Sequence, residues 1–516
     1  MTDGKRRKQI VSALGAALYA LFAAFGWQAE RYGESRPVFA ALAVCLLFAP
    51  LMYLLRALFA LGQRRKSMKD SVRPFSVGRA FAFILLAYVP MFCLSYPGAF
   101  AYDVPFQLEQ IFTGQYSSHH PLLHTLLLGG CVKLGQLLGQ INLGAALYTI
   151  LQMTGLAACF ALACASVARQ SGARAARWSA VFFALYPLHM FFSVNATKDV
   201  LFSGLFVLTL SLVREAFVLG MDRRLGMRIA VVGALMMLLR NNALYAVAVW
   251  VILLLAMYRR QALAPAGAML LAVLLCLGGG RAMKAATNAA DGDLCEMLSW
   301  PIQQLARARN LHGDLLTEEE KTAIDELMPH ESWKLYDPTI SDPVKFEFDT
   351  QRLLLDPAKY GKVYLSVGAK CAKAYFDALL MHTYSFFYPY GEYGVSGYYL
   401  QMGISDQYYD WCDFERISSQ SLFPRVLASL SWRFGARGAM QIPVIGYLFN
   451  MGVIIWLMLF LVLRDAYHGR WRCFAIGLLP VLLWGTFLLG PVMAGRYIYP
   501  FVCCLPVLAS RIIENE

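Results

Sequence analysis

Long apolar stretches constrain this chain more than any other feature of its sequence. A helix needs about 20 apolar residues to cross roughly 30 Å of hydrocarbon, because each residue adds about 1.5 Å. Hydrophobic residues make up 58% of the chain and charged residues 15%, against roughly 45–50% and about 25% in soluble domains. We therefore predict an all-α polytopic membrane protein with roughly eleven to thirteen transmembrane helices. The strongest runs are 37–62, 79–97, 143–166, 199–219, 442–463 and 473–490, and the weaker ones are 9–27, 120–139, 178–194, 229–258, 264–280 and 493–510.

Basic residues gather in the short loops between these runs. This is the positive-inside pattern, which sets the orientation of a membrane protein rather than its partner. The net charge of +13 therefore does not indicate a nucleic-acid partner. Lys5-Arg6-Arg7-Lys8 precedes the first run without a small-residue cleavage site after it, so we predict an uncleaved helix with a cytoplasmic N-terminus. The other basic clusters are 64–73, 223–228, 259–260 and 464–472.

The orientation predicted from these loops divides the chain into three parts. An N-terminal transmembrane block at 1–281 carries a first outer loop at 95–120. An extracytoplasmic domain at 282–441 follows, and 442–516 form a C-terminal transmembrane block. This domain holds most of the acidic residues, whereas the loops on the other side are basic, as the positive-inside pattern requires.

The orientation of 120–177 stays open. Two full crossings at 120–139 and 143–166 would place Arg169, Arg174 and Arg177 outside, against the charge pattern. Either one of the two segments is short or re-entrant, or the charge rule fails for this loop. The direction of every helix up to Arg260 depends on this choice.

The insert is predicted to be mostly helical. Thr317 followed by Glu320 has the spacing of a capping box, which predicts a helix through Met328. Further helices are expected around 343–356 and, with amphipathic character, near 358–381.

Two features of the insert have more than one interpretation. Aromatic residues are dense from Tyr384 to Trp411. Such rings are typical of a membrane interface, which we favour, and they also stack on sugars. The insert also holds Cys295, Cys371 and Cys412, two of which could form a disulfide, although their spacing matches no known framework.

Polar residues of the first outer loop form the first candidate site. Asp103 lies just beyond a predicted spanning helix, and Gln107 follows one helical turn later. His119 and His120 precede the next apolar run, and His124 shares a helical face with His120. A carboxylate and imidazoles at a membrane surface can perform acid–base chemistry. The alternative is a loop of solvated polar groups beside a structural histidine.

Three further polar groups lie within or between apolar runs. Lys198-Asp199 could be a snorkelling pair at a helix end or a phosphate-binding lysine beside a carboxylate. Arg240-Asn241-Asn242 and Arg496-Tyr497 lie at membrane depth, where charged groups face a protein interior or a water-filled cavity. Two buried arginines without a matching number of intramembrane acids indicate an anionic partner such as a phosphate. Structural pairing with Asp199 or Glu215 is the alternative.

Taken together, these residues resemble the GT-C class of polytopic glycosyltransferases, which includes protein O-mannosyltransferases and lipid A aminoarabinose transferases. In finer detail the chain resembles a family of bacterial membrane proteins without an assigned function, over most of residues 80–510. The features that carry this resemblance are Pro97-Gly98, Asp103, Gln107, His120-Pro121, Thr125, Lys198-Asp199, Arg240-Asn241-Asn242, Pro301 with Gln303-Gln304, and Arg496-Tyr497 with Pro500.

The resemblance implies a polyprenyl-phosphate-linked sugar donor and an acceptor outside a bacterial cell membrane. Asp103 would then be the general base, while Lys198, Arg240 and Arg496 would hold the donor phosphate. Asp199 would orient Lys198 or contribute to a divalent metal site, although the chain lacks the Asp-x-Asp or Glu-x-Asp pair of many relatives. The supporting residues would be Gln107, His119, His120, His124, Asn241, Asn242 and Tyr497.

Other functions remain open at this stage. A transporter or flippase would use the interruption at Arg240 to line a substrate path. A scaffold for envelope assembly would use the insert as a binding module. No nucleotide-binding loop of the G-x-x-x-x-G-K-[ST] kind is present in the sequence, which agrees with a lipid-linked donor.

Overall fold

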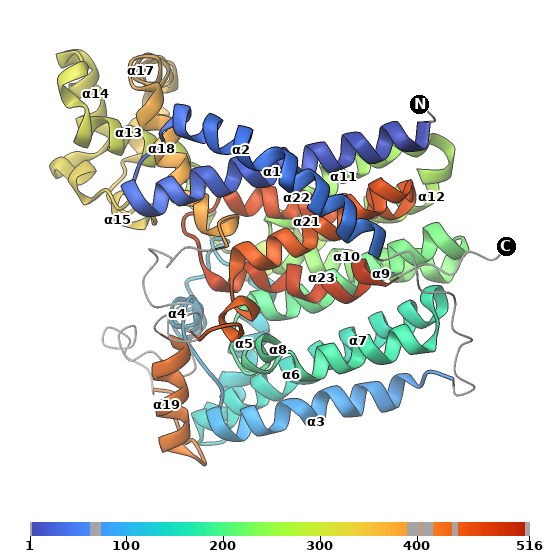
Figure 1. Cartoon of the computed structure of the whole chain (residues 1–516). Coiled ribbons are helices and arrows are strands. Elements are labelled where there is room, and N and C mark those ends of the chain that lie inside the picture. The colour runs from blue at the N-terminus through green and yellow to red at the C-terminus, as the bar shows by residue number, and fades with distance from the viewer. Residues whose placement is uncertain (1–2, 62–73, 390–403, 405–415, 436–441, 511–516) are drawn as a thin grey trace.

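The computed structural model describes residues 3–61, 74–389, 404, 416–435 and 442–510. These residues form helices joined by turns, and none of them belongs to a strand longer than an isolated bridge. Most long helices run side by side in one bundle (Figure 1). The bundle helices are α1 (Asp3–Tyr32), α2 (Pro37–Leu61), α3 (Val77–Ser95), α6 (Ile141–Ser171), α7 (Ala173–Leu185), α9 (Lys198–Leu219), α10 (Arg223–Leu239), α11 (Asn242–Tyr258), α12 (Leu263–Thr287), α21 (Met451–His468), α22 (Trp471–Leu488) and α23 (Tyr499–Ala509).

The described part of the chain is an all-α polytopic membrane protein. Eight of its helical segments are long and apolar enough to cross a membrane. One of them, the 46-residue segment Asn242–Thr287, contains both α11 and α12, joined by a short 3₁₀ turn. Two shorter apolar helices, Leu122–Leu137 and Gly495–Ala509, accompany the eight. Counting α11 and α12 separately and adding Gly495–Ala509 gives ten candidate crossings in the described part of the chain, against the eleven to thirteen predicted.

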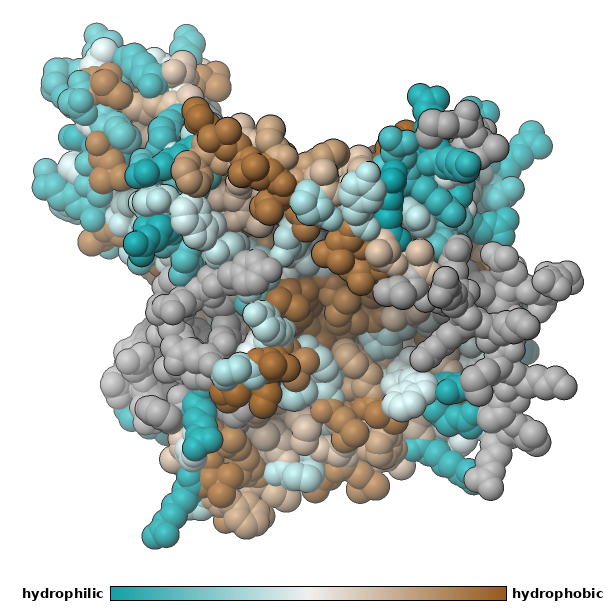
Figure 2. Space-filling model, in the orientation of Figure 1, coloured by the Kyte–Doolittle hydropathy of each residue, from teal (hydrophilic) through white to brown (hydrophobic). Residues whose placement is uncertain are grey.

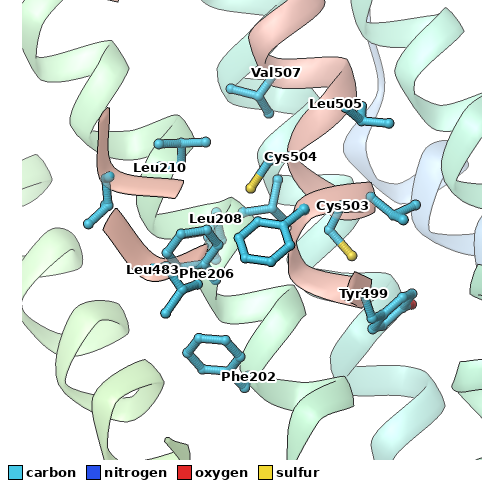
Figure 3. Close-up of a cluster of buried hydrophobic side chains, with 14 of the residues drawn as sticks. Phe202, Phe206, Leu208, Leu210, Leu483, Tyr499, Cys503, Cys504, Leu505 and Val507 are labelled. Carbon is cyan, nitrogen blue, oxygen red and sulfur yellow. The ribbon is translucent and has the colours of Figure 1, made fainter. Parts of the chain in front are cut away.

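Helix α9 lies at the centre of the bundle. Its apolar side chains Phe202, Phe206, Leu208 and Leu210 are buried against α22 and α23 (Figure 3). By contrast, α2 packs mainly on α1 and exposes Val38, Leu46 and Tyr53. Within a bilayer, such an apolar and exposed helix faces lipid.

Polar contacts identify one end of the bundle, which we call the basic end. Arg169 at the end of α6 forms an ion pair with Glu215 at the end of α9, with Nε and Oε1 2.6 Å apart. Arg472 at the start of α22 donates to the carbonyl of Phe217, also at the end of α9, at 3.3 Å. Arg169 therefore lies at the same end as the basic cluster 464–472, as the positive-inside pattern requires.

The short helix α5 (Leu122–Leu137) resolves the ambiguity over 120–177. His124 in α5 lies 2.7 Å from the hydroxyl of Tyr148 in α6, and α6 reaches Arg169 at the basic end. The first two turns of α6 therefore extend beyond Tyr148, away from the basic end, and α5 runs antiparallel beside them. Since 16 residues span only about 24 Å, α5 is a hairpin partner of α6 and not a full crossing.

The insert forms a second group of helices beyond the other end of the bundle (Figure 1). Its hydrophobic cluster from Cys295 to Tyr375 is separate from the cluster of the bundle. Figure 2 shows hydrophilic side chains on the insert and around the N-terminus, with an apolar surface between them. The helices of this group are α13 (Ser299–Leu311), α14 (Glu318–Leu327), α15 (Asp342–Lys345), α16 (Thr350–Leu355), α17 (Pro357–Lys370) and α18 (Ala372–Thr383). Helix α19 (Pro424–Gly435), also within 282–441, packs on α3 instead (Figure 1).

The predicted capping box is confirmed. The two helices expected after it are wrong, because each of them is divided into two shorter helices. Thr317 and Glu320 exchange both bonds of the box at the start of α14. The helix expected at 343–356 is divided because Asp349 caps a new helix, α16. The helix expected at 358–381 is divided at Cys371, where the ring of Tyr375 packs over Gly368.

The cysteines of the insert show no disulfide within the described residues. Cys295 and Cys371 are buried free thiols, and Cys412 lies outside the described residues. Most of the aromatic stretch 384–411 also lies outside them, whereas Tyr384, Phe386 and Phe387 are buried against the bundle. These three rings therefore attach the end of the insert to the spanning helices.

Candidate active site

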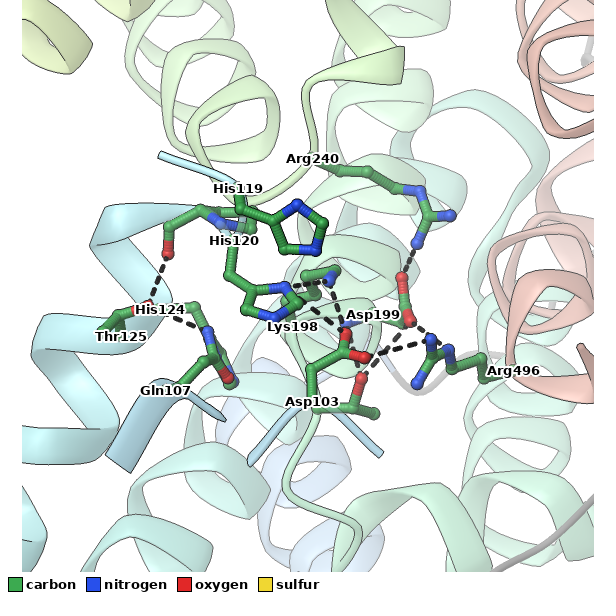
Figure 4. A network of polar contacts seen from close by, with 12 residues as sticks. Asp103, Gln107, His119, His120, His124, Thr125, Lys198, Asp199, Arg240 and Arg496 are labelled. Carbon is green, nitrogen blue, oxygen red and sulfur yellow. Dashed lines mark hydrogen bonds and ion pairs between the residues drawn. The ribbon is translucent and has the colours of Figure 1, made fainter. Parts of the chain in front are cut away.

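Asp103 lies at the N-cap of α4 (Val104–Thr113), where an aspartate normally caps its own helix. Here the side chain makes no capping bond. The carboxylate instead accepts a bond from Lys198 Nζ at 2.5 Å and one from Arg496 Nη2 at 3.3 Å (Figure 4). Tyr102, directly before it, has a φ of 57°, a left-handed conformation that is costly for a non-glycine residue. Such strained residues concentrate at functional sites.

A short backbone pairing brings Lys198 and Asp199 to this carboxylate. The amide of Ala99 donates to the carbonyl of Val194, and the amide of Ala196 donates to the carbonyl of Ala99, each at 2.8 Å. The first outer loop is thereby tied to the segment that leads into α9. Thr197 caps α9, so Lys198 and Asp199 are its first two residues and lie at the end of the bundle opposite the basic end.

Asp199 binds two arginines from distant parts of the chain. Arg240 forms an ion pair with its Oδ1, and Arg496 Nε lies 3.5 Å from its Oδ2. Arg240 stands in extended conformation between α10 and α11, which is where the sequence predicted an interruption. Arg496 belongs to the 3₁₀ turn before α23. The guanidinium of Arg240 also stacks on the ring of Tyr497, 4.6 Å from its centroid.

This cluster carries more positive than negative groups. Among the described residues, the three basic side chains Lys198, Arg240 and Arg496 surround the two carboxylates of Asp103 and Asp199. Arg240 Nε and Arg496 Nη1 are buried without a hydrogen-bond partner in the described part of the chain. Buried donors of this kind normally have an acceptor, so the cluster has the composition of an anion site.

The surroundings determine the protonation of the two groups in the outer loop. Burial by itself raises the pKa of Asp103, but the charges of Arg496 and Lys198 outweigh it and hold this pKa well below its ordinary value. Burial, with the nearby Lys198 ammonium, holds the pKa of His120 well below its ordinary value. At neutral pH Asp103 is therefore a carboxylate and His120 a neutral imidazole, whose Nδ1 lies 3.4 Å from Lys198 Nζ.

A buried hydrogen-bond chain supports the cluster from behind. Gln107 in α4 binds Thr125 and His124 in α5, each at 2.9 Å. The other ring nitrogen of His124 lies 2.7 Å from the hydroxyl of Tyr148, which binds Gln152 at 2.9 Å. This hydrogen-bond chain therefore links α4, which begins after Asp103, to α5 and α6.

The hydrogen-bond chain ends at backbone carbonyls of the segment that precedes Lys198. Gln152 Nε2 donates to the carbonyls of Ser193 and Asn195, at 3.0 and 2.8 Å. Tyr148 and Gln152 were missed by the sequence analysis, because both lie inside a long apolar run. Their only signal was that they stand four residues apart, on one face of that helix.

The remaining predicted residues lie outside this cluster. His119 is exposed, with its Nδ1 3.9 Å from a carboxylate oxygen of Glu296 in the insert. Asn241 is exposed and Asn242 half-buried. Within the described ranges, no hydrogen bond or ion pair joins either amide to the carboxylates or basic side chains of the cluster.

The described residues do not fit the divalent metal that the sequence left open. They contain no group of three histidine, cysteine, aspartate or glutamate side chains that could hold a metal ion. Asp103 and Asp199 are each bound by basic side chains, which would compete with a cation for both carboxylates.

Comparison with known proteins identifies a family but not an activity. A family model described as "Family of unknown function (DUF6020)" matches residues 96–516. Since this match covers well over half of the chain, the protein belongs to that family. No curated protein and no solved structure matches the chain. The matched range begins just before the first outer loop and contains every residue of the cluster around Asp103.

Proposed function

We propose that this member of the DUF6020 family is a membrane glycosyltransferase. It would move a sugar from a polyprenyl-phosphate-linked donor to an acceptor on the extracytoplasmic side of a bacterial cell membrane. The observation that carries this proposal is the excess of buried basic groups around one partly exposed carboxylate, at the end of a spanning bundle. A lipid-linked donor keeps its tail in the bilayer, so its phosphate lies at the depth of such a cluster.

The charge of the cluster favours a donor with one phosphate. Three basic groups and two carboxylates leave one positive charge in excess, with His120 neutral. A sugar linked through one phosphate carries a single negative charge, which balances this excess. A diphosphate-linked donor would leave the occupied cluster with a net negative charge.

The proposed mechanism uses exchange of partners at Asp103. In the free site Lys198 and Arg496 bind Asp103, whose carboxylate is a weak base while it is so paired. A donor phosphate that binds the same two cations would displace the carboxylate and raise its basicity. Asp103 would then take the proton of an acceptor hydroxyl as the hydroxyl oxygen forms a bond to the anomeric carbon. The bond from that carbon to the phosphate oxygen breaks, and the basic groups stabilise the departing phosphate.

Asp103 and Asp199 have different roles in this proposal. The side chain of Asp103 is 20% exposed and that of Asp199 only 1%. A base must reach an acceptor, which favours Asp103. Asp199 lies between the two arginines and holds them in position.

A transporter or flippase for an anionic lipid is the second candidate. The observation that favours it is the extended conformation of Arg240, which separates α10 from α11 beside the cluster. Interrupted helices of this kind form substrate sites in transporters. Such a protein needs the arginines but no base, so replacing Asp103 separates the two candidates.

The test is sugar transfer in proteoliposomes from a panel of radiolabelled polyprenyl-phosphate sugars. Asp103→Asn should lower transfer by at least about a hundredfold, because a positioned general base contributes about that much or more. Asp291→Asn is the matched control, since its side chain is 87% exposed and its partner Lys284 lies outside the cluster. Equal transfer by wild type and Asp103→Asn would remove this base from the mechanism. Absence of transfer, with movement of a lipid-linked anion instead, would favour the transporter.

A further inference from the structure

One face of α1 changes from basic to apolar along its first three turns. Arg6 and Arg7 come first, and Ile10, Val11 and Leu14 follow at helical spacing. Ile10 and Leu14 are more than half exposed, although both are large apolar side chains. This face lies at the basic end, far along the chain and the bundle from the cluster around Asp103.

An open cleft lies where this face meets the start of α22. Its volume is about 280 Å³, and its walls are Arg6, Arg7, Ile10, Val11 and Trp471. Trp471, the first residue of α22, is 44% exposed. The cleft therefore combines two guanidinium groups, an indole and apolar side chains.

The guanidinium groups of Arg6 and Arg7 can still bind an anion. Arg7 Nε donates to the carbonyl of Tyr467 at 3.4 Å, which fixes this side chain against the end of α21. Arg6 is exposed. Among the described residues, no carboxylate lies within ion-pair distance of Arg6 or Arg7. Lys8 adds a third positive charge beside the cleft, with its Nζ 5.4 Å from the ring centroid of Tyr467.

We propose that this cleft binds the headgroup of an anionic phospholipid of the bilayer. Its arginines precede its apolar side chains along α1, just as the headgroup of a lipid precedes its acyl chains. The arginines would face the phosphodiester and Trp471 the ester region, where tryptophan is enriched in membrane proteins. Ile10 and Leu14 would contact the first part of an acyl chain. Basic pockets between helices on the basic side are a known mode of lipid headgroup recognition.

The positive-inside pattern alone does not account for this arrangement. Arg259 and Arg260 lie at the same end of the bundle and carry the same charge, but they contribute nothing to the walls of this cleft. A general attraction to an anionic surface would use both pairs equally. A built site would depend on Arg6 and Arg7 far more strongly than on Arg259 and Arg260.

The experiment measures lipid binding by the purified full chain in neutral detergent. Phosphatidylglycerol and phosphatidylcholine with the same acyl chains are added, and affinity is followed by native mass spectrometry. The combined substitution Arg6→Gln and Arg7→Gln should weaken phosphatidylglycerol binding by about thirtyfold, from the usual contribution of two basic groups near an anionic headgroup. The pair Arg259→Gln and Arg260→Gln should leave it within about threefold of wild type.

A second measurement locates the lipid without depending on those substitutions. Phosphatidylglycerol with brominated chains should quench a part of the tryptophan fluorescence that Trp471→Phe removes, and brominated phosphatidylcholine should not. Equal weakening by both arginine pairs would overturn the proposal, as would quenching that Trp471→Phe leaves unchanged. Displacement of the lipid by millimolar inorganic phosphate alone would identify a free-anion site and would overturn it as well. None of these readouts uses sugar transfer, so the result is independent of the proposed function.

Discussion

Asp103 and Asp199 differ in how their loss should affect stability. Asp199 is almost completely buried between Arg240 and Arg496, so Asp199→Asn would leave the buried guanidinium of Arg240 without its carboxylate partner and Arg496 with Asp103 alone. We expect this substitution to lower the free energy of unfolding by about 3–5 kcal/mol. Asp103→Asn should lower the free energy of unfolding by less than about half as much. Its side chain is partly exposed, and Arg496 would still form an ion pair with Asp199. Unfolding in mixed micelles with increasing SDS measures both. Equal losses would contradict the separate roles proposed for the two carboxylates.

The pH dependence of transfer follows from the ion pairs of Asp103. Its pKa in the folded protein lies well below the ordinary value of about 3.9, so the carboxylate and its contribution to stability are lost only as the pH falls below that value. We expect the acidic limb of kcat/KM to lie below about pH 4. Removing a cation raises this pKa, so Lys198→Gln should move the limb to higher pH. A wild-type limb near pH 6.5 would instead indicate a histidine.

Tyr148 tests whether the buried hydrogen-bond chain positions the site. Tyr148→Phe would leave His124 and Gln152 without their shared partner, and we expect a loss of about 1–3 kcal/mol in stability with a fall in kcat. Tyr88→Phe is the matched control, because among the described residues the equally buried Tyr88 hydroxyl binds only the carbonyl of Phe183. The control should lose comparable stability and keep its kcat. Loss of kcat in both variants would contradict a positioning role for Tyr148.

At the scale of elements, the close approach of α5 and α6 depends on glycine. A methyl group on Gly135 would overlap the backbone of Gly144, whereas one on Gly130 in the same helix would meet nothing within 4 Å. We expect Gly135→Ala to destabilise the protein by about 1–3 kcal/mol. Gly130→Ala should be neutral or stabilising by up to about 1 kcal/mol, from helix propensity. Thermal unfolding of the two variants provides the measurement, and equal midpoints would show that the hairpin tolerates a wider separation.

Sequence patterns predicted the ends of helices where interactions between residues close in sequence determine them. The capping box at Thr317 was predictable because both of its bonds lie within four residues, and the interruption at Arg240 was predictable because a charge is costly at membrane depth. The cap at Asp349 is equally local, because its bond goes to the amide of Arg352, whereas the break at Cys371 was not predictable in the same way. The break at Cys371 accompanies the packing of Tyr375 over Gly368, which is visible only in three dimensions.

The candidate site was predictable as a set of residues but not as an arrangement. Charges in the first outer loop and within or between apolar runs identified Asp103, Lys198, Asp199, Arg240 and Arg496, and the structure brings all five together. Asn241 and Asn242 have the same sequence signal as Arg240, yet among the described residues neither bonds to the carboxylates or basic side chains of the cluster. Composition does not reveal which side of an interrupted helix faces the protein interior.

At the scale of the whole molecule, the direction of every helix follows from where α5 ends. The structure places the end of α6 with the basic cluster 464–472, and it places the turn between α5 and α6 beyond the cluster around Asp103. From the positive-inside pattern we propose that the basic end faces the cytoplasm and the insert the opposite side.

Short epitope tags inserted at Gly139 and at Gly172 test this topology, because each glycine lies in a turn with positive φ. In right-side-out vesicles an antibody should bind the tag at Gly139, and in inside-out vesicles the tag at Gly172. If α5 crossed the whole membrane, the tag at Gly139 would move to the cytoplasmic side and Arg169 to the outer side. The ion pair between Arg169 and Glu215 would then have to break, since both ends of α9 are fixed by contacts at opposite ends of the bundle. Labelling of both tags from one side would therefore contradict the fold, and labelling of Gly139 from the cytoplasmic side would contradict the proposed outer location of Asp103.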